Sequence, residues 1–329
     1  MIFDIFGFGA DSIAHVGRLE SFVSVVWREC YNADGFFQLE VVKTEEAVSL
    51  LQLGRVVKSS ESPCPCWITA AYDQRGKWIA SGRPMTDILH HRVADETVFN
   101  ENGESAMRRL VADCLPWPCL SLAPSRGLPD VFTRQKSNTD IFDFCAEIGK
   151  ELDMGFRIVM QGGQLLFDAY KPADTGNFKF ATKFGNLKEV QVSISDTNYK
   201  NFAVVLGAEE NGGRAKVTVG DQKSAGFDRR EMIVDARDVQ PQQGETISSP
   251  EYLERLVLRG LEKLAEQQRI DTIEFTPISD DVQLGDIATC ILPEYGLLIT
   301  ARVTTIETVV QIGKTERRIT VDGATVKRK

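Results

Sequence analysis

The 329-residue chain has only three histidines, so it lacks the side chain that most metal sites and general bases use. Its seven cysteines are odd in number and scattered, whereas a secreted disulfide framework would be even and denser. The one close pair, Cys64-Pro65-Cys66, has two interpretations: half of a metal or redox site, or two small apolar side chains that enter a strand. No second Cys-X-X-Cys or histidine pair accompanies it, so we favour the second and expect no metal and no cofactor.

Long apolar runs are also lacking. No segment approaches the roughly 18 consecutive apolar residues that a membrane helix needs. The N-terminal residues carry Asp4 without a basic region, so we expect no signal peptide, and synthesis in the host cytoplasm. Gly7-Phe8-Gly9 lacks the third glycine of a dinucleotide fingerprint, and the common P-loop, zinc-protease and nucleophile-elbow motifs are absent.

Basic residues are in short supply, with 38 Lys and Arg against 47 Asp and Glu and a net charge of −9. Proteins that bind nucleic acid through its phosphates usually carry the opposite sign, so we expect no sequence-specific nucleic acid partner. Hydrophobic residues make up 43% and charged residues 26%, which is typical of a folded globular chain. The length predicts two or three domains.

The first hundred residues read mainly as β. Short runs rich in Val and aromatic residues alternate with polar turns, which predicts a small barrel or sandwich over residues 1–100. Within it, a short helix is expected at 44–53, capped by Thr44.

Residues 101–175 predict an α+β unit. Helical periodicity covers 104–115 and 141–152, and Asn138 or Thr139 is the expected cap of the second helix. Two short strands follow, joined through Gln161-Gly162-Gly163, which suits a hairpin.

Residues 176–329 return to strands and predict a second β-barrel. Its sequence contains the strongest helix pattern of the chain, at 250–268, with Ser248 or Ser249 as cap. The expected buried stripe of this helix is Leu253, Leu256, Val257, Leu261 and Leu264. The fold class is therefore α+β and mainly β.

Two residue groups allow a functional and a structural interpretation. His90 and His91 are adjacent and would face opposite sides of a strand, so a surface or interface pair is favoured over a shared ligand site. Trp27 and Trp78 are expected in the core, whereas Trp67 and Trp117 are candidates for glycan stacking.

Several segments together resemble the hub proteins of siphovirus tails, the module that also begins tail-associated lysins. The resemblance spans about residues 20–305 and rests on short matches in the family's order. The most characteristic are Gly35-Phe36-Phe37-Gln38-Leu39-Glu40, Phe184-Gly185-Asn186-Leu187, Phe227-Asp228-Arg229-Arg230-Glu231, Val234-Asp235-Ala236-Arg237-Asp238, Arg259-Gly260-Leu261-Glu262-Lys263-Leu264-Ala265 and Leu284-Gly285-Asp286-Ile287.

The resemblance implies two tail-tube-type β-barrels with an intervening α+β domain. It implies a homotrimeric ring, located in the virion tail, that joins the sixfold tail tube to a distal spike, fibre or lysin and lines the DNA channel. The expected partners are further copies of the chain, a tube or distal tail protein, the tape measure protein and the component at the tip. Closed rings are the usual result of heterologous contacts that complete a rotation.

The resemblance does not imply an enzyme. The sequence ends at Lys329 without the peptidase or glycosidase extension of the lysins, so no wall-degrading activity is expected and no catalytic residue is assigned. The alternatives are a tail-associated peptidoglycan hydrolase and a receptor-binding or glycan-binding tail-tip module. The candidate interface residues are Arg229, Arg230, Glu231, Asp235, Leu284, Gly285 and Asp286. Charged pairs in the first four suggest inter-subunit salt bridges, and the last three predict a turn before a strand.

Overall fold

The computed structural model describes residues 1–9, 11–94, 97–136, 139–172, 178–210, 212–267, 270–277 and 282–328. The chain forms two compact units. Unit 1 comprises Met1–Gln191 and Ile273–Lys329, and unit 2 comprises Val192–Thr272. Strands hold 48% of the residues and helices 21%, which confirms the mainly-β fold class.

The N-terminal part of unit 1 is built of strands, as predicted. They are β1 (Phe3–Phe8), β2 (Ile13–Leu19), β3 (Ser24–Cys30), β4 (Phe36–Val42), β5 (Val56–Ser59), β6 (Cys66–Gln74) and β7 (Lys77–Pro84). Arg75 and Gly76 have φ of 52° and 77°, and the type I′ turn that joins antiparallel strands such as β6 and β7 requires two positive φ angles. The helix α1 (Glu45–Leu50) begins where predicted, since the Thr44 hydroxyl accepts the N–H of Ala47 at 3.1 Å.

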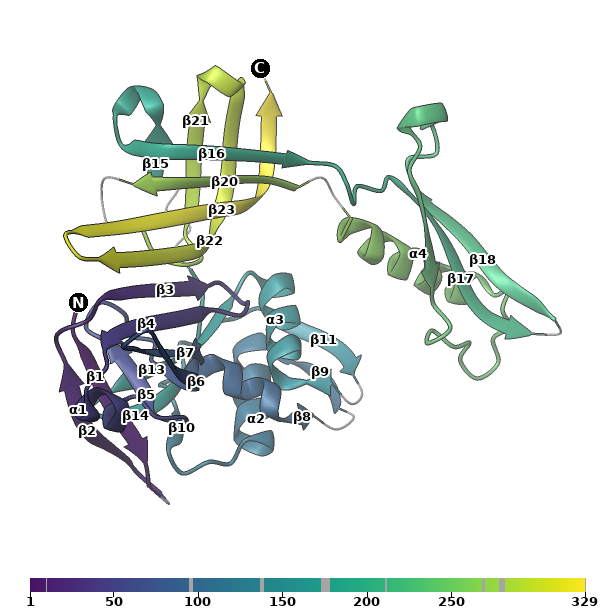
Figure 1. The fold of residues 1–329 in the computed structure, drawn as a ribbon. Coiled ribbons are helices and arrows are strands. Elements are labelled where there is room, and N and C mark those ends of the chain that lie inside the picture. Colours follow the sequence, from purple (N-terminus) through teal and green to yellow (C-terminus); the bar gives the residue numbers. More distant parts are fainter. Residues whose placement is uncertain are drawn as a thin grey trace. The chain divides into compact units, whose positions relative to one another are not determined.

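The C-terminal strands join the same sheet (Figure 1). They are β15 (Phe178–Ala181), β16 (Leu187–Ser195), β20 (Ile270–Pro277), β21 (Ile287–Leu292), β22 (Leu297–Gln311) and β23 (Lys314–Arg328), with the short 3-10 helices η2 (Thr182–Phe184) and η4 (Pro293–Tyr295). The strand order is β16-β20-β23-β22-β3-β4-β7-β6-β5-β1-β2. Outside this order, β21 pairs with β22 on one side and with β15 on the other. The sheet forks at β22, because residues 297–302 of this strand pair with β21 and residues 305–311 pair with β3.

An α+β part lies between these two sets of strands in the sequence. It contains the 3-10 helix η1 (Met85–His91), the helices α2 (Gly103–Cys114) and α3 (Ile141–Leu152), and the strands β8 (Val93–Ala94), β9 (Thr97–Asn102), β10 (Leu120–Leu122), β11 (Val131–Lys136), β12 (Thr139–Asp140), β13 (Gly155–Gln161) and β14 (Gln164–Tyr170). The predicted hairpin is confirmed, with Gly162 and Gly163 at positive φ between β13 and β14. The two helices contribute their apolar faces to one core.

The cap of α3 differs from the prediction. Asp140 is the cap residue, and its Oδ1 accepts the N–H groups of Phe142 at 2.8 Å and Asp143 at 3.2 Å. Thr139 lies in β12 instead, and Asn138 lies outside the described residues. A carboxylate at this position also complements the positive end of the helix dipole.

Unit 2 is a two-layer structure. The strands β17 (Phe202–Glu210), β18 (Gly213–Gly220) and β19 (Glu231–Asp235) form a sheet in the order β18-β17-β19, preceded at β19 by the 3-10 helix η3 (Gly226–Asp228). The helix α4 (Pro250–Ala265) packs on one face of this sheet (Figure 1). Tyr252 fixes the contact, since its hydroxyl accepts the N–H of Ala208 at 2.7 Å and donates to the carbonyl of Val239 at 3.0 Å.

The buried stripe of α4 is only partly the predicted one. Leu256 and Leu264 are buried as expected, but Tyr252 and Gly260 complete the buried row and Leu261 is 47% exposed. The reason is Gly260: a Cβ there would lie 2.4 Å from Val205 Cγ2, so the helix approaches the sheet through its glycine. The predicted position of the cap at Ser249 is confirmed, but its hydroxyl accepts from Thr246 and does not cap the helix.

The predicted domain limits at residues 100 and 175 remain predictions, as does the assignment of helix 250–268 to a second barrel, with residue 268 outside the described part. In the described parts of the chain, no helix is long and apolar enough to cross a membrane.

Candidate functional site

The predicted charged residues of unit 2 are already paired within the chain near the start of β19. Arg229 Nε donates to Glu231 Oε1 at 2.6 Å, and the Arg229 guanidinium lies 3.7 Å from the ring centre of Phe202. Arg230 forms an ion pair with Asp196 at 2.8 Å. Arginines of this kind, stacked on aromatic rings, are common at protein interfaces.

Asp235, at the end of β19, lies between two arginines. Arg237 and Arg214 approach its carboxylate to 2.6 Å and 2.8 Å. Their hydrogen bonds, that of Arg237 first, lower the pKa of Asp235 to about 2. The carboxylate is therefore charged at neutral pH. Its predicted role in inter-subunit salt bridges remains a prediction.

The predicted turn at Leu284-Gly285-Asp286 is present before β21. Asp286 accepts the N–H of Gln283 at 2.9 Å, and burial raises the pKa of its carboxyl. Gly285 has φ of +88°, and a Cβ there would lie 2.6 Å from Pro172 and 2.7 Å from Tyr31, so only glycine fits. The first four candidate residues thus lie just before and along β19 of unit 2 in separate ion pairs, and the other three form one turn in unit 1.

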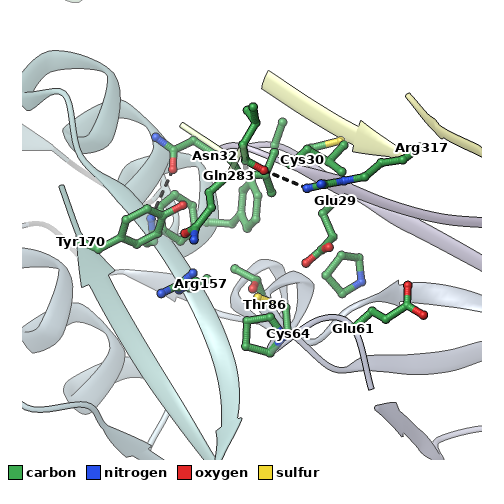
Figure 2. Close-up of a pocket in the computed structure, with 18 residues that line it drawn as sticks. Glu29, Cys30, Asn32, Glu61, Cys64, Thr86, Arg157, Tyr170, Gln283 and Arg317 are labelled. Carbon is green, nitrogen blue, oxygen red and sulfur yellow. Dashed lines mark hydrogen bonds between the residues drawn. The ribbon is translucent and has the colours of Figure 1, made fainter. Parts of the chain in front are cut away.

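Unit 1 also has a pocket that the sequence analysis missed. Its volume is about 330 Å³, and Figure 2 shows side chains from several segments around it. Charged and polar walls come from β3, β13, β14 and β23, and the residues that supply them are Glu29, Arg157, Tyr170 and Arg317.

Two carboxylates line this pocket, Glu29 and the exposed Glu61, and Glu29 is the more buried of them. Burial raises its pKa, although a 2.7 Å hydrogen bond from the Ser62 hydroxyl and the nearby Arg317 and Arg157 act in the opposite direction. The sequence contains a signal for this pocket. Val25, Trp27 and Glu29 are spaced by two along β3 and therefore face the same side, and Val25 and Trp27 are buried. A charged residue on the buried face of a strand is a reason to look for a site.

Arg157 separates the pocket from a second cavity of about 390 Å³, whose walls also include Arg126 and Asp168. The buried Asp168 accepts from Arg157 at 3.0 Å and from Arg126 at 2.9 Å on both oxygens. On its other side, Arg157 lies 4.5 Å from the ring centre of Tyr170. Both arginines are thereby held in fixed positions.

The thiols near the pocket are protonated at neutral pH. Burial raises the pKa of Cys64 to about 12 and raises that of Cys66 as well. A protonated thiol is a poor nucleophile, which supports the structural interpretation of the Cys64-Pro65-Cys66 pair.

His90 lies among several carboxylates of unit 1. Its Nε2 lies 3.1 Å from Asp34 and its Nδ1 lies 3.1 Å from Asp140, while its ring stacks on Phe142 at 4.2 Å. Asp34, Asp87 and His90 have donor atoms close enough for one cation, and so do His90, Asp140 and Asp143. Arg83 already pairs with both Asp34 and Asp87, so the cluster is explained by ion pairs.

Trp67 and Trp117 are half-buried against the core, whereas His91 is exposed. His91 contacts Trp67 edge to face at 5.4 Å, and Trp117 contacts Phe8 at 4.8 Å. Both indole rings are half-buried against the apolar core, whereas a glycan platform needs an exposed ring face. Trp27 is buried, as predicted.

The chain matches a family model described as "Siphovirus ReqiPepy6 Gp37-like protein" over residues 10–321. No curated protein matches it. Among solved structures, it is similar to the tail protein of Neisseria meningitidis MC58, with a TM-score of 0.59, 12% identity, and coverage of 98% of this chain and 96% of that one.

Two further structures have the same fold. The 43 kDa tail protein of prophage MuSo2 from Shewanella oneidensis aligns with a TM-score of 0.60 and 11% identity over 97% of this chain and 98% of that one. A chain of the phage P2 baseplate in its activated conformation with Ca aligns with a TM-score of 0.54 and 11% identity over 98% of both. These findings confirm the resemblance to phage tail proteins. The chain therefore belongs to the Siphovirus ReqiPepy6 Gp37-like family of phage tail and baseplate structural proteins, which locates it in the virion tail.

Proposed function

We propose that the chain is the hub of a phage tail tip or baseplate. Three copies form a ring that joins the sixfold tail tube to the distal spike, fibre or lysin and surrounds the path of the DNA and tape measure protein. The observation that carries the proposal is the match to the family over residues 10–321. The fold likeness to two tail proteins and a baseplate chain over almost the full length of each supports it.

The continuous sheet of unit 1 suits this role. The first and second sets of strands are hydrogen-bonded through β3 and β22, so the two β regions of one chain belong to one continuous sheet. A hub that presents two β regions per copy gives six such regions in a trimer, which matches the sixfold symmetry of a tube.

We further propose that the chain acts by assembly and not by catalysis. The described histidines are engaged: His15 pairs with Asp4, His90 with Asp34 and Asp140, and His91 packs on Trp67. The pocket thiol of Cys64 is protonated, so it offers no nucleophile at neutral pH.

The test is the mass of the full chain in solution. Mass photometry at several concentrations, alone and with the tube protein of the same phage, is expected to show a species of about 110 kDa, three times the 36.6 kDa chain. A chain that stays at its monomer mass under all of these conditions would contradict the hub. Clearing of a cell-wall zymogram by the purified chain would contradict the non-enzymatic role.

A further inference from the structure

The pocket of unit 1 has the size and composition of a site for a small ligand. Its volume of about 330 Å³ falls in the range of ligand clefts, roughly 300–1,000 Å³. The apolar part of its wall includes the buried side chains of Phe142, Phe156 and Ile306. Charged groups reach the same space from segments that are far apart in the sequence, so only the folded chain brings them together.

Glu29 is a charged group of this wall that lacks a counter-ion. Figure 2 shows its carboxylate directed into the space that the labelled side chains surround. The Ser62 hydroxyl donates to Oε1 at 2.7 Å, and no basic side chain in the described parts of the chain forms an ion pair with either oxygen. Burial raises the pKa of Glu29 in spite of Arg157 and Arg317, so its negative charge is incompletely compensated.

The two arginines of the wall already have partners. Arg157 donates two hydrogen bonds to Asp168, at 3.1 Å and 3.0 Å. Arg317 donates to the carbonyl of Val282 at 2.8 Å. An anionic ligand would therefore compete with acceptors that are in place, whereas a cationic ligand would supply the charge that Glu29 lacks.

We propose that the pocket binds an aliphatic ammonium ion, whose charge pairs with Glu29 and whose carbon chain packs on Phe142 and Phe156. The ammonium can belong to a free amine or to a lysine side chain of another tail protein, since both present the same group. The site lies within unit 1 of one copy, so the inference goes beyond the hub and does not depend on the ring.

The acceptors favour a compact ammonium over a guanidinium. A guanidinium fork binds both oxygens of a carboxylate side by side, but the Ser62 hydroxyl already occupies Oε1 of Glu29. An ammonium needs only one carboxylate oxygen together with neutral acceptors, and the Gln283 side chain on the wall carries an amide oxygen. On the same wall, Glu61 already pairs with an ammonium, the N-terminal group of Met1, at 3.3 Å.

The test is the binding of n-butylammonium, the lysine side chain without its backbone, to the full-length chain. Saturation-transfer NMR at pH 8 is expected to give a dissociation constant of about 1 mM, as is usual for so small a ligand. 1-Butanol has the same carbon chain without the charge, and it is expected to bind at least about tenfold more weakly. Equal binding of the two ligands would contradict the ion pair.

Two variants locate the site. Glu29→Gln keeps an oxygen for the Ser62 hydroxyl but removes the charge, so n-butylammonium is expected to bind at least about tenfold more weakly. Glu20→Gln makes the same change at an exposed carboxylate outside the pocket, and binding is expected to match the wild type. Circular dichroism and a thermal melt check that both variants are folded. Unchanged affinity in Glu29→Gln would overturn the proposal.

The pH dependence of the wild type is a test that needs no variant. Protonation removes the charge of Glu29, so n-butylammonium is expected to bind several-fold more weakly at pH 5.5 than at pH 8. The thiols of Cys30 and Cys64 and the phenol of Tyr170 also line the pocket, but burial raises their pKa values and they stay neutral over this range. The two arginines stay charged. Glu61 is the other carboxylate, and loss of the pH dependence in Glu29→Gln distinguishes the two. Equal affinity at both pH values would contradict the role of Glu29.

Two further ligands identify the source of the ammonium. Nα-acetyl-lysine amide binds more tightly than n-butylammonium if the natural occupant is a lysine side chain, because its peptide groups add contacts. 1,4-Diaminobutane binds more tightly, by more than the factor of about two that its identical ends provide, if the occupant is a free amine. Either result supports the site, whereas failure of all three ammonium ligands to bind overturns it. The mass of the assembly does not enter these measurements, so the hub and this site stand or fall separately.

Discussion

Asp168 is a buried carboxylate that two guanidinium groups share. It accepts from Arg157 and from Arg126, and its own side chain is almost inaccessible to solvent. We expect Asp168→Asn to lower the free energy of unfolding of unit 1 by about 2 kcal/mol, because it removes the negative charge that both arginines face. The loss is limited because both guanidinium groups are partly exposed and solvent hydrates their charge. Urea unfolding followed by tryptophan fluorescence measures this, since all four tryptophans lie in unit 1.

The matched control for this prediction is Asp130→Asn. Asp130 is 37% exposed and pairs with Lys171 at 2.8 Å. Exposed pairs of this kind contribute little, so the control is expected to change stability by less than about 0.5 kcal/mol. Equal effects from the two substitutions would show that the burial of Asp168 does not matter.

His90 is the residue whose contribution depends on pH. Burial acts against its charge, but hydrogen bonds to Asp34 and Asp140 prevail and raise the pKa of the imidazole above its ordinary value. Because the pKa of His90 is higher in the folded state than its unfolded value near 6.5, protonation of the imidazole stabilises the fold. This contribution is fully present below the unfolded pKa and is lost as the pH rises through the folded pKa. The other charged groups close to His90 are Asp87 and Asp143, and Arg83 pairs with Asp34 and Asp87.

We therefore expect His90→Gln to destabilise unit 1 most at pH 5.5 and progressively less at pH 7 and pH 8.5. Gln keeps a donor but carries no charge, so the pH dependence isolates the imidazolium. The measurement is the difference in urea midpoint between wild type and variant at each pH. A difference that is constant or that grows with pH would contradict the ion-pair assignment.

At the scale of the element, α4 is positioned by a glycine. An alanine at 260 would gain about 1 kcal/mol of helix propensity, but its Cβ would come within 2.4 Å of Val205 and 2.9 Å of Val219. Both valines are β-branched and packed in the unit 2 core, so they have little room to shift. The clash is the larger effect, and Gly260→Ala is expected to destabilise unit 2 by about 1 kcal/mol net.

Hydrogen exchange of peptides from residues 192–272 measures this effect, and tryptophan fluorescence of unit 1 is expected to stay unchanged. Glu254→Gly compared with Glu254→Ala gives the propensity term alone, at an exposed position of the same helix. Slower exchange in Gly260→Ala than in the wild type would mean that propensity dominates and that the close approach is not tight.

The same helix shows what the sequence could predict. The apolar spacing in 250–268 identified the element, because helical periodicity is local. The spacing did not identify which face of the helix is buried, because the leucines 253, 256, 261 and 264 are compatible with two faces. The contact of Gly260 with the sheet selects one of them. The cap of α3 was missed for a similar reason, because Asn138, Thr139 and Asp140 are all good caps and the geometry chooses Asp140.

At the scale of the whole molecule, long-range pairing was beyond the sequence. Arg28 on β3 donates to Glu307 on β22 across 279 residues, and no local pattern links these strands. The pocket depends on that pairing, since Glu29 and Arg317 come from opposite ends of the chain. The family resemblance was enough to predict the fold. The pocket could not be predicted, because its side chains meet only once the register of the paired strands is known.

The charge of the whole molecule gives the last prediction. Each chain carries a net charge of −9, so a ring of three carries about −27 by multiplication. Nonspecific DNA binding depends on the release of counterions by clustered Lys and Arg, and the chain has nine more carboxylates than basic groups. If the chain surrounds the path of the DNA as proposed, a wall of this composition would repel phosphates, and DNA would pass without adhering. The measurement is fluorescence anisotropy with a labelled nonspecific duplex at about 150 mM salt. No saturable binding is expected up to about 100 μM protein, whereas the tightest typical nonspecific dissociation constants are near 1 μM. Lowering the salt is expected to leave this unchanged, and binding that strengthens steeply as salt falls would show that basic groups line the path instead.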